Sequence, residues 1–438
     1  MNSVLEARDL YTAAFDRLSG AASAPAWLTT LRREAMDRFT VLGFPTTRDE
    51  EWRFTSVAPI ANRPFGPPAA APVEAPPLDR AIVLDDALAT LVFVNGRYAP
   101  ASSDVTNVPR GVEIGSLAAQ IERDPATVEP HLARHATLDD RTFTALNTAV
   151  WQDGAFVRLP AGVSLDGPVQ LIFVSVPGSD PFATHPRVLI LAGPGSRSRF
   201  VERYVSAGEG SHFTNAVAEV VLSDGATVDH YRVVQESLAA YHVSSLHVHL
   251  ARAANFASHA ITLGGALVRH EAIAVLGGEG GECTLNGLYL VDGERLVDNH
   301  TTIDHAQPHC SSHEMYKGVL AGRGRGVFNG KIIVRQDAQK TDAKQTNKAL
   351  LLSETSQINT TPQLEIFADD VRCTHGATVG QLDADQLFYL QARGIGRDRA
   401  RHMLIHAFAS EVLARVQIPT LRTSLEAALQ RQLPGGDA

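Results

Sequence analysis

The segment DGATVDHYRVV, residues 224–234, joins an Asp-Gly turn to a short run in which apolar and polar side chains alternate. Such alternation is typical of a β-strand with one buried face. Segments of the same kind are GPGSRSRFVERYV (193–205), ANFASHAITLG (254–264) and GGECTLNGLYL (280–290). Their turn residues recur at intervals of roughly 26 to 30 residues, at Gly195, Gly225, Asn255 and Gly281. This near-constant spacing predicts a solenoid, in which each coil buries its apolar face on the next.

The strand pattern continues from about residue 155 to 372 with almost no helix signal. A series of more than 200 residues is long for one β-sandwich, and no helices alternate with the strands as in a doubly wound sheet. We therefore expect residues from about 150 to 372 to form one continuous β-helix. A large sandwich or barrel is the alternative.

The chain before the solenoid mixes helices with a short hairpin. One helix is expected near residues 5–18, and a second begins at Pro25 and stops at Gly43. The proline- and alanine-rich stretch 66–77 reads as a linker or extended loop. LVFVNGRY (91–98) predicts a strand, an Asn-Gly turn and a second strand, and a further helix is expected at 143–150.

The chain after the solenoid is helical again. Asp383 is placed to cap a helix that ends at Gly394, and a long helix follows over 397–416. The second helix has two adjacent apolar stripes, formed by Leu404, Phe408, Val412 and Val416 and by Ile405, Ala409 and Leu413. A face this wide packs on the chain's own domain, or part of it receives another protein.

These patterns divide the chain into three predicted regions. Residues 1–80 form an N-terminal helical region with the linker, and residues 377–438 form a C-terminal helical domain. The β-helix core occupies residues 81–376, with an entry α/β segment to about residue 150.

Composition narrows the classes of function. Hydrophobic residues make up 44% and charged residues 20% of the 438 residues, as in an ordinary globular protein. The net charge of −9 argues against nucleic-acid binding, and three cysteines are too few for a disulfide framework, which suits the cytoplasm. There is neither a signal-peptide pattern nor a run of 18 apolar residues, so we expect no membrane segment.

Familiar catalytic motifs are missing from the sequence. It contains no P-loop, GxGxxG, CxxC or GxSxG, and HEMYK at His313 lacks the second histidine of a zinc-protease motif. We therefore expect a protein that is not an enzyme and binds no nucleotide. A β-helix carbohydrate-active lyase or hydrolase is the alternative, and it would need a carboxylate cluster along one face of the solenoid.

Two stretches carry candidate metal ligands. In DNHTTIDHAQPHCSSH (298–313) the histidines fall on different strands or turns if the segment is not helical, so surface histidines are favoured over a metal site. In DDVRCTHGAT (369–378), Cys373 and His375 share one face of a strand because they are two residues apart. We expect Gly376 to end that strand and leave His375 at the rim.

Thiolate and imidazole are suitable ligands for iron or zinc, but two ligands alone make a weak site. Further ligands would have to come from elsewhere, for example from another chain. The alternative is a buried cysteine beside a hydrogen-bonded rim histidine. A Cys-His hydrolase is least favoured, because no oxyanion loop or orienting acid accompanies the pair.

From about residue 44 to 415 the sequence resembles the SufB/SufD family of iron–sulfur cluster assembly proteins. Within that family, the segments at 44–55 and 298–312 and the chain length are more similar to the SufD branch. The matching segments are FPTTRDEEWRFT (44–55), VFVNGRY (92–98), YKGVL (316–320), NGKIIV (329–334), PQLEI (362–366), DVRCTHGAT (370–378) and FYLQARGI (388–395).

The resemblance implies a right-handed parallel β-helix between helical regions and a role as a non-catalytic scaffold subunit in the cytoplasm. The implied partners are a SufB-like paralogue and a SufC-like ABC ATPase, which hydrolyses the ATP, with a homodimer when the chain is isolated. It also implies a transient iron–sulfur cluster, or iron, at the subunit interface. His375 is the matching ligand position and Cys373 a less certain one. The implied docking residues for the ATPase are Phe388, Tyr389, Arg393, Gly394, Leu404, Phe408 and Val412.

Overall fold

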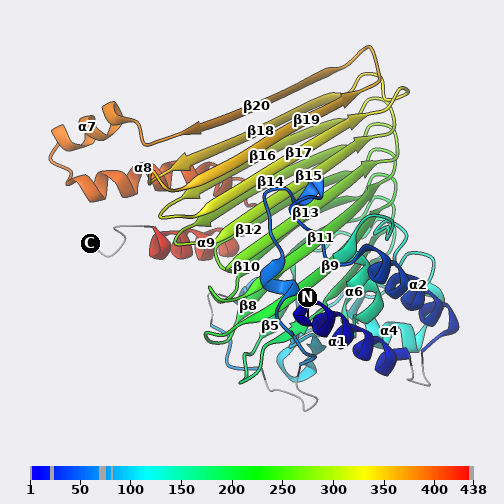
Figure 1. Ribbon diagram of the computed structural model, residues 1–438. Coiled ribbons are helices and arrows are strands. Elements are labelled where there is room, and N and C mark those ends of the chain that lie inside the picture. The colour runs from blue at the N-terminus through cyan, green and yellow to red at the C-terminus, as the bar shows by residue number, and fades with distance from the viewer. Residues whose placement is uncertain (1, 20–23, 69–74, 80–81, 434–438) are drawn as a thin grey trace.

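The structure, a computed structural model, describes residues 2–19, 24–68, 75–79 and 82–433. Its centre is a solenoid built from two long sheets (Figure 1). The first sheet runs in the order β2-β1-β5-β8-β10-β12-β14-β16-β18-β20, and the second in the order β19-β17-β15-β13-β11-β9-β7-β4-β3, with β6 beside β9.

The strands of the first sheet are β1 (Ala89–Val94), β2 (Arg97–Tyr98), β5 (Val169–Ser175), β8 (Arg197–Ser206), β10 (Thr227–Gln235), β12 (Asn255–Thr262), β14 (Glu282–Val291), β16 (Ser311–Leu320), β18 (Asp342–Leu351) and β20 (Arg372–Gly380). The strands of the second sheet are β3 (Glu113–Ser116), β4 (Gly154–Leu159), β6 (Phe182–Thr184), β7 (Arg187–Ala192), β9 (His212–Leu222), β11 (Tyr241–Leu250), β13 (Leu267–Leu276), β15 (Leu296–His305), β17 (Arg325–Val334) and β19 (Gln357–Ile366).

From β8 onward the chain alternates between the two sheets, and each strand pairs in parallel with the strand two positions later. In the first sheet Thr227 pairs with Asn255, Asn255 with Glu282, Glu282 with Ser311 and Ser311 with Asp342, so one coil takes 27 to 31 residues. The predicted parallel β-helix is confirmed. The alternative of a sandwich or barrel is wrong, because successive strands of each coil belong to different sheets and pair in parallel with the strands of the next coil.

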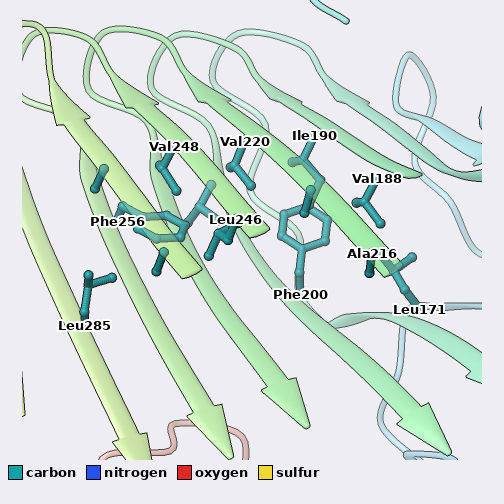
Figure 2. Close-up of a cluster of buried hydrophobic side chains, with 14 of the residues drawn as sticks. Leu171, Val188, Ile190, Phe200, Ala216, Val220, Leu246, Val248, Phe256 and Leu285 are labelled. Atoms are coloured by element: carbon teal, nitrogen blue, oxygen red, sulfur yellow. The ribbon is translucent and has the colours of Figure 1, made fainter. Parts of the chain in front are cut away.

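Alternation along each strand fills the interior of the solenoid with apolar side chains. Figure 2 shows part of this core, in which residues of both sheets meet, such as Ile190 and Val220 with Phe200 and Phe256. On β14 the inward residues Cys283, Leu285, Tyr289 and Val291 are all buried. Each coil therefore contributes a layer to one continuous core.

The N-terminal helices cover the outer face of the second sheet, where α6 contacts β9 and β11. The second helix follows Pro25 and ends before Gly43, and the hairpin turn has positive φ at Asn95 and Gly96, as the sequence predicts. Of the predicted linker 66–77, residues 69–74 lie outside the described part, and the remainder contains no helix. The helices here are α1 (Asn2–Ser19), α2 (Ala26–Leu42), η1 (Glu50–Trp52), α3 (Ala58–Ala61), η2 (Pro100–Ser102), α4 (Leu117–Arg123), α5 (Pro125–Val128) and α6 (Thr142–Val150).

The C-terminal helices are α7 (Ala384–Ala392), α8 (Arg397–Leu413) and α9 (Pro419–Gln432). Asp383 accepts hydrogen bonds from the backbone N–H groups of Asp385 and Gln386, so the predicted N-cap of α7 is confirmed. Helices α8 and α9 pack on the outer face of the first sheet. Among the helices that the structure describes, none is both long and apolar enough to cross a membrane. The exact limits of the three predicted regions stay predictions.

Candidate functional site at the open end of the solenoid

The last coil of the solenoid has only one neighbouring coil. Among the described strands, β19 pairs in its sheet with β17 alone and β20 pairs with β18 alone, so each forms the edge of a long sheet. Apolar side chains lie exposed here, with Ile366 41%, Phe367 63% and Val379 47% accessible. Unpaired edges and exposed apolar groups together mark a surface suited to another chain.

Cys373 and His375 lie on this outermost strand. In the parallel register Cys373 is opposite Ala343 and His375 is opposite Gln345, both on β18. Cys373 packs against an apolar cluster that contains Ala343 of β18 and Ile332 of β17, so this face of β20 points into the end of the solenoid interior. His375 shares that face and is exposed.

The expectation that Gly376 ends the strand is wrong. Strand β20 continues to Gly380, and Gly376 pairs with Thr346 inside the ladder. His375 is exposed for a different reason, namely that no further coil stacks on β20 in the described chain. The rim on which His375 lies is the end of the stack and not the end of a strand.

The two candidate ligands differ in their readiness to bind metal. Partial burial raises the pKa of the Cys373 thiol, so the thiolate form that a metal needs is disfavoured. Within the described residues, no three His, Cys, Asp or Glu side chains lie close enough together to hold a metal ion. A metal at His375 would therefore need most of its ligands from outside this chain.

The histidines between residues 300 and 313 do not converge. His300 is buried and faces Asp298 and Glu51 on the outside of β15, whereas His305 hydrogen-bonds Ser312. His309 is in a turn with φ 59°, and His313 is exposed on β16. The expectation of surface histidines holds for His309 and His313 and is wrong for His300 and His305, which are buried because neighbouring strands and the N-terminal region cover them.

A buried polar pair lies behind His375, and the sequence reasoning missed its role. The Gln345 side-chain amide donates a hydrogen bond to the Glu314 carboxylate over 2.7 Å between Nε2 and Oε2. Both side chains are buried, at 2% and 4% exposure. The period-two pattern Ser312, Glu314, Tyr316 could have revealed that Glu314 faces inward.

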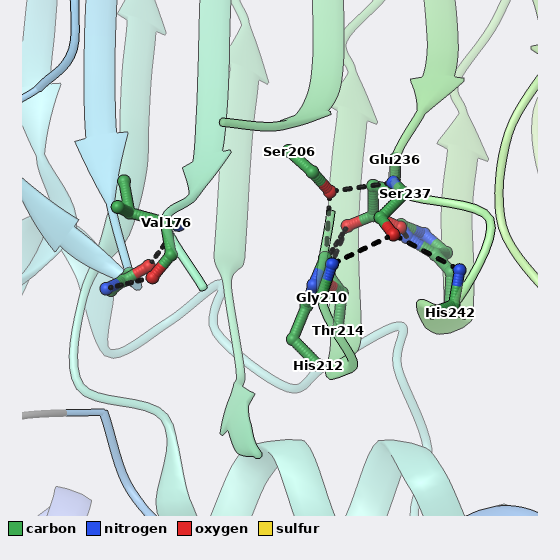
Figure 3. A network of polar contacts seen from close by, with 10 residues as sticks. Val176, Ser206, Gly210, His212, Thr214, Glu236, Ser237 and His242 are labelled. Atoms are coloured by element: carbon green, nitrogen blue, oxygen red, sulfur yellow. Dashed lines mark hydrogen bonds and ion pairs between the residues drawn. The ribbon is translucent and has the colours of Figure 1, made fainter. Parts of the chain in front are cut away.

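Other buried carboxylates lie deeper in the solenoid. Figure 3 shows Glu236, which accepts a hydrogen bond from Thr214 and contacts His242 and His212. All four side chains are buried. A cluster closed off in this way presents no face to a sugar chain, so it lends no support to the carbohydrate-enzyme alternative.

Helix α7 carries the most exposed of the predicted docking residues. Phe388 is 71% and Tyr389 56% exposed, and no side chain of this helix is buried. The Arg393 guanidinium lies 4.6 Å from the Tyr389 ring centroid, and Gly394 has φ +83° just after the helix. Figure 1 shows α7 extending beyond the sheets. Such a helix presents its aromatic residues to solvent.

Helix α8 offers less surface than its two stripes suggest. Val412 is fully buried in the core beneath α8, with Ile405, Ala409 and Leu413. Phe408 is partly buried, and the Lys317 ammonium lies 4.3 Å from its ring centroid. Val412 is thus a core residue of this chain, and the predicted docking surface narrows to α7 with the partly exposed Leu404 and Phe408.

Taken together, these features define a β-helical protein whose accessible chemistry lies at the uncovered end of the stack and on the protruding helix α7. The family description "SUF system FeS cluster assembly, SufBD core domain" matches residues 174–408, and "SufBD protein N-terminal region" matches residues 1–171.

Curated relatives agree with these matches along nearly the whole chain. The iron–sulfur cluster assembly protein SufD of Escherichia coli is 33% identical over 399 residues, covering 90% of each chain. An iron–sulfur cluster assembly SufBD family protein of Synechocystis is 30% identical, covering 91% of this chain and 89% of the relative. SufD of Bacillus subtilis is 26% identical, covering 93% and 94%. The chain therefore belongs to the SufB/SufD family of iron–sulfur cluster assembly proteins and is similar to its SufD members.

Proposed function

We propose that this chain is a SufD-like, non-catalytic scaffold subunit that works in the cytoplasm with a SufB-like paralogue and a SufC-like ABC ATPase. It helps to build a nascent iron–sulfur cluster at its contact with the SufB-like subunit. The cluster, or the iron that enters it, is cargo of the assembly and not a resident cofactor of this chain.

The observation that carries the proposal is the position of His375 on the uncovered last strand. No described strand pairs with the outer edges of β19 and β20, and Ile366, Phe367 and Val379 offer apolar area in the same last coil as the histidine. A partner that extends both sheets would bring its own ligands to the His375 ring. In the absence of that partner, a second copy of this chain can occupy the same end, which gives a homodimer.

The ATPase docks on the protruding helix. Phe388 and Tyr389 are large, exposed and close to Arg393, a combination that is common in protein interfaces. ATP is bound and hydrolysed by the partner. The contact between Lys317 on β16 and Phe408 on α8 provides a direct connection between that helix and the solenoid.

The test is co-expression of the chain with its two partners, followed by anaerobic purification and measurement of iron, sulfide and the visible absorption spectrum. His375→Ala is expected to assemble normally but to lower the iron–sulfur content severalfold, and Cys373→Ala to lower it less. His313→Ala is the matched control, because His313 is also an exposed strand histidine but lies on the outer face of β16. Wild-type iron–sulfur content in His375→Ala would contradict the proposal.

A further inference from the structure

We propose that Gln345 and Glu314 are positioning residues that orient the His375 imidazole for metal binding, with Gln345 able to face the ring either as hydrogen-bond acceptor or as donor. This inference rests on the proposed function of His375. It concerns the interior of this chain and not the partner surface.

The three residues form one row across three neighbouring strands. Glu314 on β16 is in register with Gln345 on β18, and Gln345 is in register with His375 on β20. Neighbouring strands lie about 4.8 Å apart, so successive side chains in a row are in reach of each other. All three side chains are on the inward-facing side of their strands. Gln345 lies one coil before His375 and directly beneath it.

The Gln345 amide is held in place on two sides. Its Nε2 donates to Glu314 Oε2 over 2.7 Å, and Gly330 on the opposite sheet leaves open the space that this amide fills. A Cβ atom at Gly330 would overlap Nε2 and Cδ of Gln345. The position of the amide group is therefore fixed by packing. The one freedom that remains is a rotation of about 180°, which exchanges the positions of its nitrogen and its oxygen.

The amide oxygen is the group left to act on His375. Gln345 Oε1 is buried and has no hydrogen-bond partner among the described residues. A histidine that binds metal through one ring nitrogen usually donates the N–H of the other to a carbonyl or carboxylate, which fixes its tautomer. The oxygen of Gln345 is the acceptor that lies next in the row.

The protonation state of Glu314 determines whether the oxygen or the nitrogen of the Gln345 amide faces His375. Its buried carboxyl lies within electrostatic reach of Cys283 and Tyr316 from the first sheet and near Thr301 of the second. Burial raises the pKa of Glu314 to about 7, although the Thr301 hydroxyl and the Gln345 amide pull it the other way. When ionised, the carboxylate accepts from Gln345 Nε2, and the amide oxygen is left for the ring. When protonated, the carboxyl O–H donates to the amide oxygen after the half-turn, and Nε2 then points toward the ring and competes with a metal for its lone pair.

The first experiment follows His375 itself in the full-length chain. Diethylpyrocarbonate modifies a free imidazole nitrogen, and mass spectrometry of the peptide that contains His375 gives the rate. We expect the ratio of the wild-type rate to the Glu314→Gln rate to rise severalfold between about pH 6 and pH 8, because only the wild type carries a group at position 314 that changes its protonation state in that range. Glu236→Gln, which removes a buried carboxyl several coils away, should leave the ratio independent of pH. A pH-independent ratio for Glu314→Gln would overturn the proposal.

The second experiment separates this inference from the proposed function. In the complex with both partners, Gln345→Met keeps the side-chain volume and removes the amide. We expect the partners still to co-purify and the apparent affinity for ferrous iron to fall about tenfold or more. Unchanged iron affinity in Gln345→Met, with a clear loss in His375→Ala, would overturn the positioning role and leave the proposed function intact. Unchanged affinity in both variants would overturn the proposed function.

Discussion

Cys283 and Cys373 belong to the same inward-facing row of the first sheet, with only Ser312 and Ala343 between them. Cys283 is 1% exposed in the middle of the stack, whereas Cys373 on the last strand is only partly buried. The two residues have the same type, the same strand geometry and the same facing direction. Their environments differ because the row has further coils on both sides of Cys283, whereas it ends at Cys373.

The same difference separates the whole strands. Along β14 all residues except Glu282 and Thr284 are buried, whereas β20 has no fully buried residue. A middle coil is covered on both sides by identical backbone ladders, and a last coil is covered on one. Strand alternation therefore determines which side chains face inward, and position in the stack determines whether that inward face is closed.

A charge placed in each environment should show the largest difference. Leu285→Asp puts an unpaired carboxylate in the middle of the core, and we expect it to lower the free energy of unfolding by more than about 4 kcal/mol. Val379→Asp lies in an inward row of the last coil, where the wild-type side chain is 47% exposed, and should cost less than about 1 kcal/mol. Urea unfolding followed by circular dichroism measures both. Equal losses would mean that the last coil is as closed as the middle ones.

Glycine positions give the next largest contrast. Gly318 on β16 faces the ring of Tyr289, and a Cβ atom there would overlap the ring. Gly318→Val should therefore cost about 3 kcal/mol in unfolding free energy through overpacking. Gly376 lies on the outer face of β20, where a Cβ atom meets nothing within 4 Å, so Gly376→Val should change stability by less than about 0.5 kcal/mol. Similar thermal unfolding midpoints for the two variants would contradict the comparison.

The coil itself could be predicted from the sequence because turn spacing and strand alternation are local properties. The cap at Asp383 and the stop at Gly43 were predictable for the same reason. The end of the stack could not be read in this way, and Gly376 was taken for a strand end when the strand continues through it. Which apolar stripe of α8 is covered also depends on the sheet beneath it, so Val412 could not be assigned to the core from periodicity alone.

The pH dependence of the free energy of unfolding tests how well the inside of the solenoid is shielded from water at Glu314. Because burial raises the pKa of Glu314 to about 7, the folded state holds this proton where the unfolded state has released it. Stability from this group is therefore present at low pH and is lost as the pH rises through about 7, by on the order of 2 kcal/mol between pH 5 and pH 8. Glu314→Gln should lack this component, so the difference in unfolding free energy between wild type and variant should change with pH. A constant difference would place Glu314 in a more hydrated environment than the structure shows.

The smallest effect, and the most direct, is the reactivity of the cysteines themselves. Burial raises the pKa of both thiols, but Cys283 is also sealed on every side, so iodoacetamide should label Cys373 slowly and Cys283 only after unfolding. Peptide mass spectrometry measures the two rates in the same sample, with buried Cys310 as an internal control. If a SufB-like partner continues the stack beyond β20, its addition should protect Cys373 and give it the low reactivity of Cys283. Labelling of Cys373 that is unchanged by a bound partner would show that the partner docks elsewhere and that the end of the stack stays open in the complex.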